Sequence, residues 1–208
     1  RHSLVVNRDG RIMFPELGPI TVAGLRFEEA RARIETRVSE QMIGTQATVS
    51  IGDLRSIRVY VLGEAAQPGS FTVSSLATIT NAIFVSGGVK PIGSLRNIQL
   101  KRNGQVVKRL DLYDLLLNGD TSDNVRLQPG DVIFIPPVGS TVGVTGEIRR
   151  PAIYELKGEN SVADLLHLGG GLTPEADPRL ATLHRIDDRR ERVVLDVDLT
   201  NPQSRGTS

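Results

Sequence analysis

The chain has 208 residues, of which 25 are lysine or arginine and 24 are aspartate or glutamate, and it contains no cysteine. This balanced charge gives no reason to expect nucleic acid or an anionic membrane surface as a partner, and the missing thiols exclude disulfides, cysteine-ligated metals and a cysteine nucleophile. A hydrophobic content of 39% is typical of a globular protein, and no apolar run is long enough to cross a bilayer. The first residue is arginine rather than methionine and the last eight read NPQSRGTS, so we expect an excised part of a longer protein.

The first residues predict a β-hairpin followed by one more strand. Asp9-Gly10 separates the apolar runs at 4–6 and 12–14, and an Asp-Gly pair in that setting is a strong hairpin signal. Residues 20–22 are β-branched and predict a further short strand.

A helix is predicted from about residue 27 to residue 42. Apolar side chains recur there at every fourth position, which is typical of a helix with one buried face: Ala30, Ile34, Val38 and Met42. Two oppositely charged pairs have helical spacing and are expected on the solvated face: Arg31 with Glu35, and Glu29 with Arg33. Residues 47–51 predict another strand.

The rest of the chain is organised around a stretch that it carries twice. Residues 61–91 align with residues 144–174 without a gap, and every matched pair lies 83 residues apart. The matched pairs include Gly63 with Gly146, Glu64 with Glu147, Pro68 with Pro151, Phe71 with Tyr154, Gly87 with Gly170, Gly88 with Gly171 and Pro91 with Pro174. A period this long, with strand, turn and helix signals in each copy, predicts two small domains of one type.

Each copy predicts a strand, a proline turn, a second strand with an aromatic residue, and a helix that ends at a glycine pair. Three apolar residues in each helix have i, i+3, i+4 spacing, so we expect them to be buried against a sheet: Ile79, Ala82 and Ile83 in the first copy, and Val162, Leu165 and Leu166 in the second. The copies differ at one turn, since Pro68-Gly69 suits a type II turn whereas Ala152 resists the positive φ that this turn requires.

Beyond these helices, each copy predicts a further hairpin. In the first copy, Asn103-Gly104 joins strands at 97–101 and 105–112; in the second, strands at 180–185 and 192–197 are joined through Asp187-Asp188, with an offset of 85 residues at Leu195 and Asp196.

The first copy then continues through a helical turn at 112–117 to the strand in LQPGDVIFIPP, residues 127–137. The same strand of the second copy would fall at about 217–220. We therefore expect the second copy to lack its last strand, and residues 175–208 to be poorly ordered or engaged in an intermolecular contact.

No residue set predicts catalysis, cofactor binding or metal binding. Glu64 and Glu147 could form a ligand pair but fit turn caps better, and Asp131 fits a turn. The glycines at 169–171 follow a helix rather than preceding one, which disfavours a phosphate cradle. His167 has no second ligand at i+3 or i+4, so we expect it at the surface rather than in a metal site.

The residues resemble a known family. DGRIMFPELGPITVAGLRFEEARARI resembles the central part of the polysaccharide biosynthesis/export domain, with its D-G-x-I-x-x-P hairpin followed by G-x-(I/V)-x-V-x-G and a helix. RSIRVYVLGEAAQPGSF, IFVSGGVKP and LQPGDVIFIPP resemble the SLBB (soluble-ligand-binding β-grasp) domain, and residues 140–200 resemble a second one. This order is that of bacterial outer-membrane polysaccharide export proteins.

The resemblance implies an α+β chain with an N-terminally truncated export domain at 1–55 and β-grasp domains at 56–138 and 139–208. It implies the periplasmic wall of a homo-oligomeric ring, associated with the outer membrane, through which capsular polysaccharide or exopolysaccharide passes. It further implies an inner-membrane polysaccharide co-polymerase as partner, and no enzymatic activity. The family's lipidated cysteine and C-terminal membrane-spanning segment do not occur in the sequence, so we expect wall domains without the anchor. The alternative is a soluble oligosaccharide-binding module without a pore.

Overall fold

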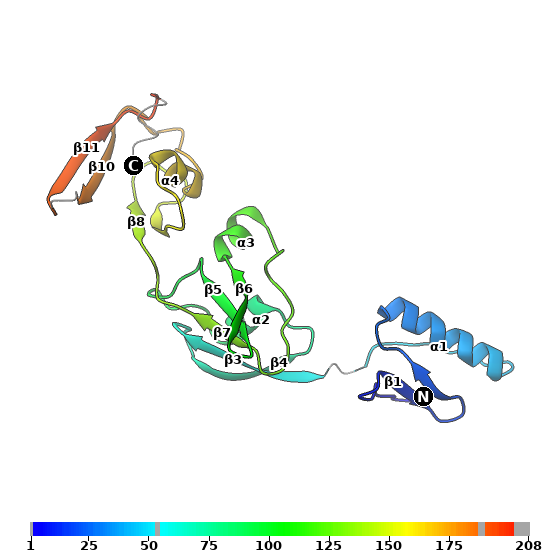
Figure 1. Ribbon diagram of the computed structural model, residues 1–208. Helices are drawn as coiled ribbons and strands as arrows, with labels where there is room; N and C mark the ends of the chain where they lie inside the picture. The colour runs from blue at the N-terminus through cyan, green and yellow to red at the C-terminus, as the bar shows by residue number, and fades with distance from the viewer. Residues whose placement is uncertain (1, 53–54, 187–189, 202–208) are drawn as a thin grey trace. The chain divides into compact units, whose positions relative to one another are not determined.

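The structure is a computed structural model that describes residues 2–52, 55–186 and 190–201 (Figure 1). The chain is α+β and divides into two compact units, Arg1–Arg55 and Ser56–Ser208. Among the residues described, none of the helices combines the length and the apolar character needed to cross a bilayer.

The N-terminal unit is a two-stranded sheet packed on one helix. Its elements are β1 (Arg11–Phe14), β2 (Gly18–Thr21) and α1 (Phe27–Gln41). The helix buries Ile34 and Val38, as their spacing predicted, and these pack with Ile12, Leu17 and Ile20 from the hairpin. The charge pair between Arg31 and Glu35 is confirmed at 2.9 Å.

The predicted hairpin between residues 4–6 and 12–14 is wrong, because the strand that pairs with β1 is β2. The Asp-Gly turn does form, since the Asn7 side chain accepts N–H bonds from Asp9 and Arg11. However, the carbonyl of Gly10 accepts from Val22 and Ala23, so the turn is tied to the end of β2.

Two other predictions for this unit are also wrong: a strand at residues 47–51 and an ion pair between Glu29 and Arg33. Residues 47–51 form no strand; Ala47 and Val49 pack against the core without a pairing partner. Glu29 and Arg33 do not pair with each other, because Glu29 accepts the Arg26 N–H at the helix start and Arg33 donates to the Thr21 carbonyl.

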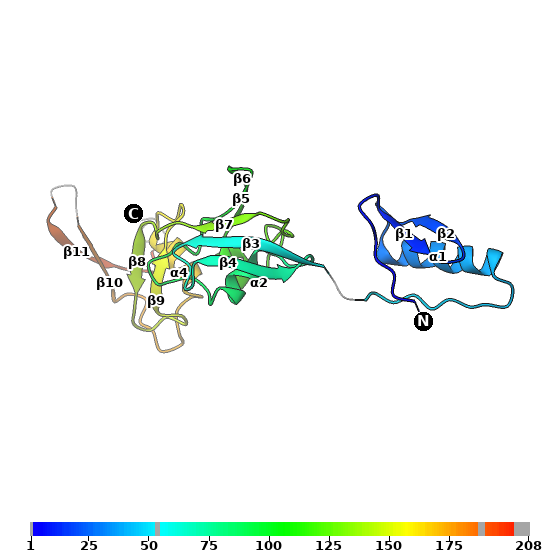
Figure 2. The same cartoon turned by 90° about the horizontal axis from the view of Figure 1, so that it is seen from below.

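The first repeat, residues 56–138, is a five-stranded mixed sheet with a helix packed against it, and it agrees with the predicted β-grasp. Its strands are β3 (Ser56–Gly63), β4 (Gly69–Ser74), β5 (Ile98–Arg102), β6 (Gln105–Leu110) and β7 (Val132–Ile135), in the spatial order β4-β3-β7-β5-β6 (Figure 2). Its helices are α2 (Ile79–Val85) and α3 (Leu112–Asn118). The last strand, β7, is therefore the central one, parallel to β3 and antiparallel to β5.

The core of this repeat lies between the sheet and α2. Ile79, Ala82 and Ile83 are buried, as predicted, against β-branched residues of the central strands such as Val61 and Ile133. The turn at Asn103-Gly104 is also confirmed, since both residues have positive φ.

The described part of the second repeat contains counterparts of β3, β4, α2, β5 and β6, without a joined sheet. Its elements are β8 (Thr141–Val144), β9 (Ala152–Glu155), α4 (Val162–Leu168), β10 (Ala181–Ile186) and β11 (Arg192–Val197). The strands β8 and β9 form one two-stranded sheet and β10 and β11 another, and within the described residues no strand lies between them.

The difference between the repeats is also visible at Gly63 and Gly146, the glycines that precede Glu64 and Glu147. Gly63 has a φ of +81°, and a β-carbon on it would collide with the Ile135 carbonyl oxygen of β7. Gly146 has a similar φ of +92°, yet among the described residues, its two chain neighbours aside, no atom lies within 4 Å of the equivalent β-carbon position. The close approach of a central strand, which excludes a side chain at Gly63, is thus not made in the described part of the second repeat.

The predicted burial of Val162, Leu165 and Leu166 is wrong, because all three are only half-buried. Without a continuous sheet beneath it, α4 buries Leu168 instead.

Two predictions about the alignment of the copies are also corrected. Gly69 and Ala152 are both first residues of a strand, and neither has a positive φ, so the expected difference in turn type is wrong. The later offset is 87 rather than 85, because Val197 pairs with Ala181 as Leu110 pairs with Ile98. The tip at Asp187-Asp188 lies outside the described residues.

Candidate functional site

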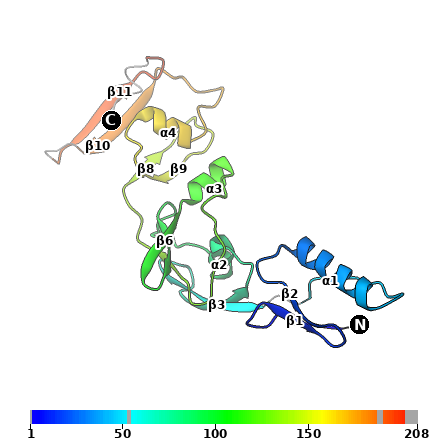
Figure 3. The same ribbon diagram turned by 45° about the vertical axis from the view of Figure 1, so that its right-hand side comes forward.

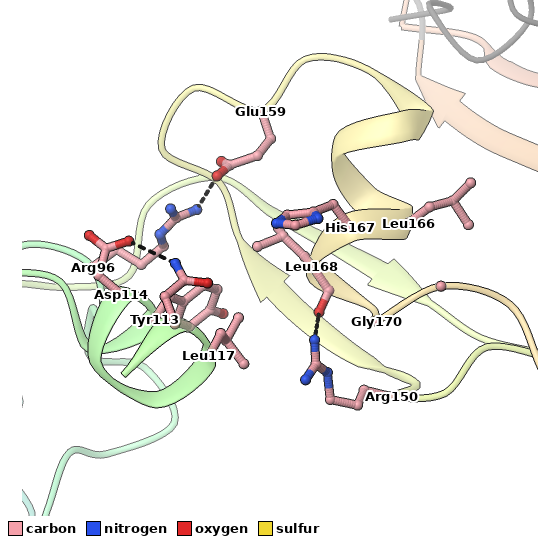
Figure 4. Close-up of a pocket in the computed structure, with 12 residues that line it drawn as sticks. Arg96, Tyr113, Asp114, Leu117, Arg150, Glu159, Leu166, His167, Leu168 and Gly170 are labelled. Carbon is pink, nitrogen blue, oxygen red and sulfur yellow. Dashed lines mark hydrogen bonds and ion pairs between the residues drawn. The ribbon is translucent and has the colours of Figure 1, made fainter. Parts of the chain in front are cut away.

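The candidate site lies where the second repeat meets the first. In the ribbon of Figure 3, α3 of the first repeat lies near α4 of the second. A pocket of about 580 Å³ is lined by residues of both helices (Figure 4). One wall consists of Arg96, Tyr113, Asp114, Leu117 and Asn118. The other includes Arg150, Glu159, Leu166, His167 and Leu168.

Beside this pocket, five charged residues hold the repeats together; we call them the clasp: Arg96, Asp111, Glu155, Lys157 and Glu159. Arg96 and Asp111 belong to the first repeat, where Arg96 Nε lies 3.1 Å from a carboxylate oxygen of Asp111. Both side chains are almost fully buried, with 9% and 2% of their surface exposed. Buried charges require partners, and the second repeat supplies them.

The segment after β9 provides these partners. Glu159 accepts from Arg96 Nη1 at 2.7 Å, and Lys157 Nζ donates to Asp111 at 3.0 Å. Arg96 also donates to the carbonyl oxygen of Glu155 at 3.1 Å. Arg96 and Asp111 thereby each gain an oppositely charged partner from the second repeat.

Of the three residues that the second repeat contributes to the clasp, Glu155 is the most deeply buried. One of its carboxylate oxygens accepts the N–H groups of Leu95 at 2.8 Å and Arg96 at 3.2 Å, and the other accepts that of Gly139 at 3.1 Å. Its own N–H donates to the Tyr113 hydroxyl at 3.0 Å. One glutamate thus satisfies three backbone donors that would otherwise be costly to bury.

The contact between Arg96 and Glu159 favours the charged form of both side chains. Burial alone would raise the pKa of Glu159, but hydrogen bonds from the Lys157 backbone N–H and the Arg96 side chain outweigh it, so the pKa lies below its ordinary value. Burial likewise opposes the charge on Arg96, and the bonds to Glu159 and Asp111 nevertheless raise the pKa of Arg96.

An aromatic pair supports the same contact. The guanidinium of Arg96 lies 4.7 Å from the centre of the Tyr113 ring, within cation–π range. Tyr113 meets Tyr154 of β9 edge to face, with ring centres 6.2 Å apart. The contact is therefore packed as well as charge-balanced.

The residues considered from the sequence lie mostly away from this contact. Glu64 and Glu147 make matched contacts within their own repeats: Glu64 approaches Lys90 Nζ at 3.8 Å, and Glu147 accepts from the Thr173 hydroxyl at 2.8 Å. In both repeats the glutamate's backbone carbonyl also accepts the N–H of that partner residue. Each of these carboxylates therefore stabilises its turn by contacting another side chain, Lys90 or Thr173, and not by accepting backbone N–H groups.

The remaining candidates divide between structure and pocket. Asp131 is a turn residue, as predicted, since it accepts the Gln128 N–H, but it is also buried and binds Arg102 through two bonds of 2.8 Å. The glycines at 169–171 follow α4, and His167 is exposed on the pocket wall. In the described ranges, no three His, Cys, Asp or Glu side chains come together as a metal site.

The sequence contains one signal for the clasp: charged residues of the second copy at positions that are uncharged in the first copy. Three charged residues lie at the end of β9 and just after it, and the residues 83 positions earlier are uncharged: Thr72 for Glu155, Ser74 for Lys157 and Leu76 for Glu159. Matched positions report the shared fold, whereas these mismatched positions report the contact made only between the two repeats.

Three family models match the chain in succession. Residues 2–52 match "Polysaccharide biosynthesis/export protein", and residues 57–135 and 141–194 each match "SLBB domain".

Curated relatives agree with this order. The chain is 32% identical over 203 residues to the EPS I polysaccharide export outer membrane protein EpsA of Ralstonia nicotianae, covering 95% of the chain and 53% of the relative. It is 30% identical over 162 residues to the polysialic acid transport protein KpsD of Escherichia coli, covering 77% and 29%. It is 26% identical over 182 residues to the capsule polysaccharide export protein BexD of Haemophilus influenzae, covering 85% and 45%. The chain thus spans about half or less of the length of these relatives.

Proposed function

The chain belongs to the bacterial polysaccharide biosynthesis/export proteins that carry SLBB domains, and on this premise we propose that it forms part of the wall of an outer-membrane polysaccharide export channel. In this proposal, copies of the protein assemble into a homo-oligomeric ring in the periplasm. Capsular polysaccharide or exopolysaccharide passes through the ring, which receives it from an inner-membrane polysaccharide co-polymerase. The protein has no catalytic role and no nucleic-acid partner.

The observation that carries the proposal is the clasp within an export-domain and double-SLBB chain. A channel wall built from stacked small domains must keep its successive layers in register. Arg96 and Asp111 are buried and pair with each other, and each has a second charged partner across the contact, Glu159 and Lys157, which separation of the repeats would remove. The clasp therefore favours a rigid double layer over two independently moving domains.

The composition suits passage of a polymer. The chain has five phenylalanines, three tyrosines and no tryptophan, so it offers few of the flat surfaces on which sugars are held tightly. A long polysaccharide moves only if each of its units is bound weakly, and sparse aromatic surfaces meet that demand.

Electron microscopy of the protein expressed from its complete gene tests the ring. We expect closed rings with a central opening, whereas the 208-residue chain is expected to be monomeric or weakly associated in light scattering at micromolar concentration. A complete protein that stays monomeric in membranes and in detergent would refute the ring. A stable ring of the 208-residue chain would instead place the assembly contacts within these residues.

The pocket favours a second candidate, a soluble oligosaccharide-binding module without a pore. Its volume of about 580 Å³ lies within the range of small-ligand sites, about 300–1,000 Å³. The two candidate functions differ in the oligomeric state that they require. A binding module works as a monomer, whereas a channel wall requires the ring.

A further inference from the structure

The pocket between the repeats contains a guanidinium, that of Arg150, that has no ion-pair partner among the described residues. No carboxylate among the described residues lies within ion-pair distance of Arg150, whose Nη2 donates to the Leu168 carbonyl at 3.1 Å (Figure 4). A guanidinium has five N–H donors, so four remain after this bond. A backbone carbonyl thus fixes the side chain at the pocket wall while most of its donors remain available.

The loop after α4 lies against this guanidinium. Gly170 has a φ of +77°, and a β-carbon there would lie 3.2 Å from the Arg150 guanidinium. A side chain at this position would therefore be strained and would press on the guanidinium. Glycine at this position therefore leaves room for the Arg150 side chain.

Among the described residues, none of the other charged groups of the pocket forms an ion pair with Arg150. Arg96 and Glu159 neutralise each other at 2.7 Å. On the opposite wall, Asp114 accepts only a long bond from the Asn118 amide, at 3.5 Å, and is available as a hydrogen-bond acceptor. The pocket thus has the guanidinium of Arg150 on one wall and the carboxylate of Asp114, a hydrogen-bond acceptor, on the other.

Between these polar groups the lining is apolar and aromatic. Tyr113 and Leu117 contribute from the first repeat and Leu168 from the second. A sugar ring has apolar C–H faces and hydroxyl edges, which fit such an alternation of apolar surface with hydrogen-bonding groups. A carboxylate on the sugar would fit the guanidinium, which binds carboxylates through two parallel bonds.

We propose that this pocket binds an acidic saccharide unit, a sugar that bears a carboxylate, with Arg150 holding the carboxylate and Asp114 accepting a hydroxyl. The inference rests on the proposed role in polysaccharide export and assigns to that role a contact with the exported chain. A neutral sugar would leave the guanidinium without a partner, so the pocket discriminates in favour of the acidic one. Because the site is open to solvent, binding is weak enough for the polymer to move on.

Titration of the full 208-residue chain with two oligosaccharides of equal length tests this. One consists of glucuronic acid units and the other of glucose units, and amide signals of residues lining the pocket are followed by nuclear magnetic resonance. We expect saturable shifts at Tyr113 and Gly170 with the acidic oligosaccharide only. Arg150→Gln should weaken binding by about tenfold or more, because the variant loses the hydrogen bonds between a cation and the sugar carboxylate.

Arg149→Gln is the matched control, because Arg149 is exposed and does not line the pocket. It removes the same charge from the next position and should leave binding nearly unchanged. If Arg150→Gln does not fold, Arg150→Lys is read instead; it keeps the charge but loses the planar fork, and it should also weaken binding.

Equal binding of both oligosaccharides, binding of neither, or equal losses from the Arg149 and Arg150 variants would overturn the proposal. These outcomes are separable from failure of the export role. Absence of a ring would refute the channel while leaving a binding result intact, and absence of binding would leave a ring intact.

Discussion

Glu155 shows why the contact between the repeats was hard to predict. Its carboxylate accepts N–H groups from Leu95 and Arg96, about sixty residues earlier in the chain. Hydrophobic periodicity reports helices and strands but not which distant loops meet. Only the fold places Glu155 and Lys157 against Arg96 and Asp111.

Glu159 predicts how acid affects stability. Its pKa is lowered from an ordinary value of 4.5, so its charged form stabilises the folded chain above about that pH, and the contribution is lost as pH falls through the lower folded-state pKa. Glu159→Gln should reduce the free energy of unfolding at pH 7 by roughly 1–3 kcal/mol. The difference from the parent should shrink as pH falls below 4.5.

Urea unfolding at several pH values measures this difference. Glu175→Gln is the control, since Glu175 is exposed and lies outside the clasp. A Glu159 variant whose deficit is the same at pH 3 as at pH 7 would show that the lost contact is not the charged one.

At the scale of elements, the sequence predicted best where strong local signals coincided with a partner. The Asn103-Gly104 hairpin and the buried face of α2 were both correct. Residues 4–6 and 47–51 have strand-like composition but lack a pairing partner, so no strand forms there. The spacing of α4 was helical as predicted, but its burial depended on a joined sheet that the described residues do not form.

The equivalent helices α2 and α4 should therefore respond differently to the same change. Ile83 is 2% exposed, and Ile83→Ala should lower the free energy of unfolding by roughly 2–5 kcal/mol. Leu166 occupies the matched position but is half-buried, so Leu166→Ala leaves no closed cavity and should cost less than roughly 2 kcal/mol. Equal losses in denaturant unfolding would mean that α4 is covered as fully as α2.

At the scale of the whole molecule, the export domain and the repeats are separate units, whereas the two repeats form one. The clasp predicts that the repeats move as one body, and the absence of cysteine makes this measurable. Spin labels on Val107→Cys in β6 and Ala163→Cys in α4, both exposed, should give a narrow distance distribution. Glu155→Ala should broaden it, because three backbone donors lose their acceptor.

The control is Glu175→Ala, which should leave the distribution narrow. Circular dichroism should show that the Glu155 variant keeps its secondary structure, because each repeat has its own sheets and helices. A distribution that is equally narrow with and without Glu155 would show that other contacts hold the repeats together.

The proposed export role is tested most directly by the amount of polysaccharide at the surface of cells whose own copy of the gene has been deleted. The complete protein and its Glu175→Ala variant should restore surface polysaccharide. A variant combining Arg96→Ala and Glu155→Ala, present in the envelope at the parental level, should restore much less, because the repeats of the channel wall are no longer held in register. Surface polysaccharide at the parental level with this double variant, or none with the complete protein, would contradict the proposal.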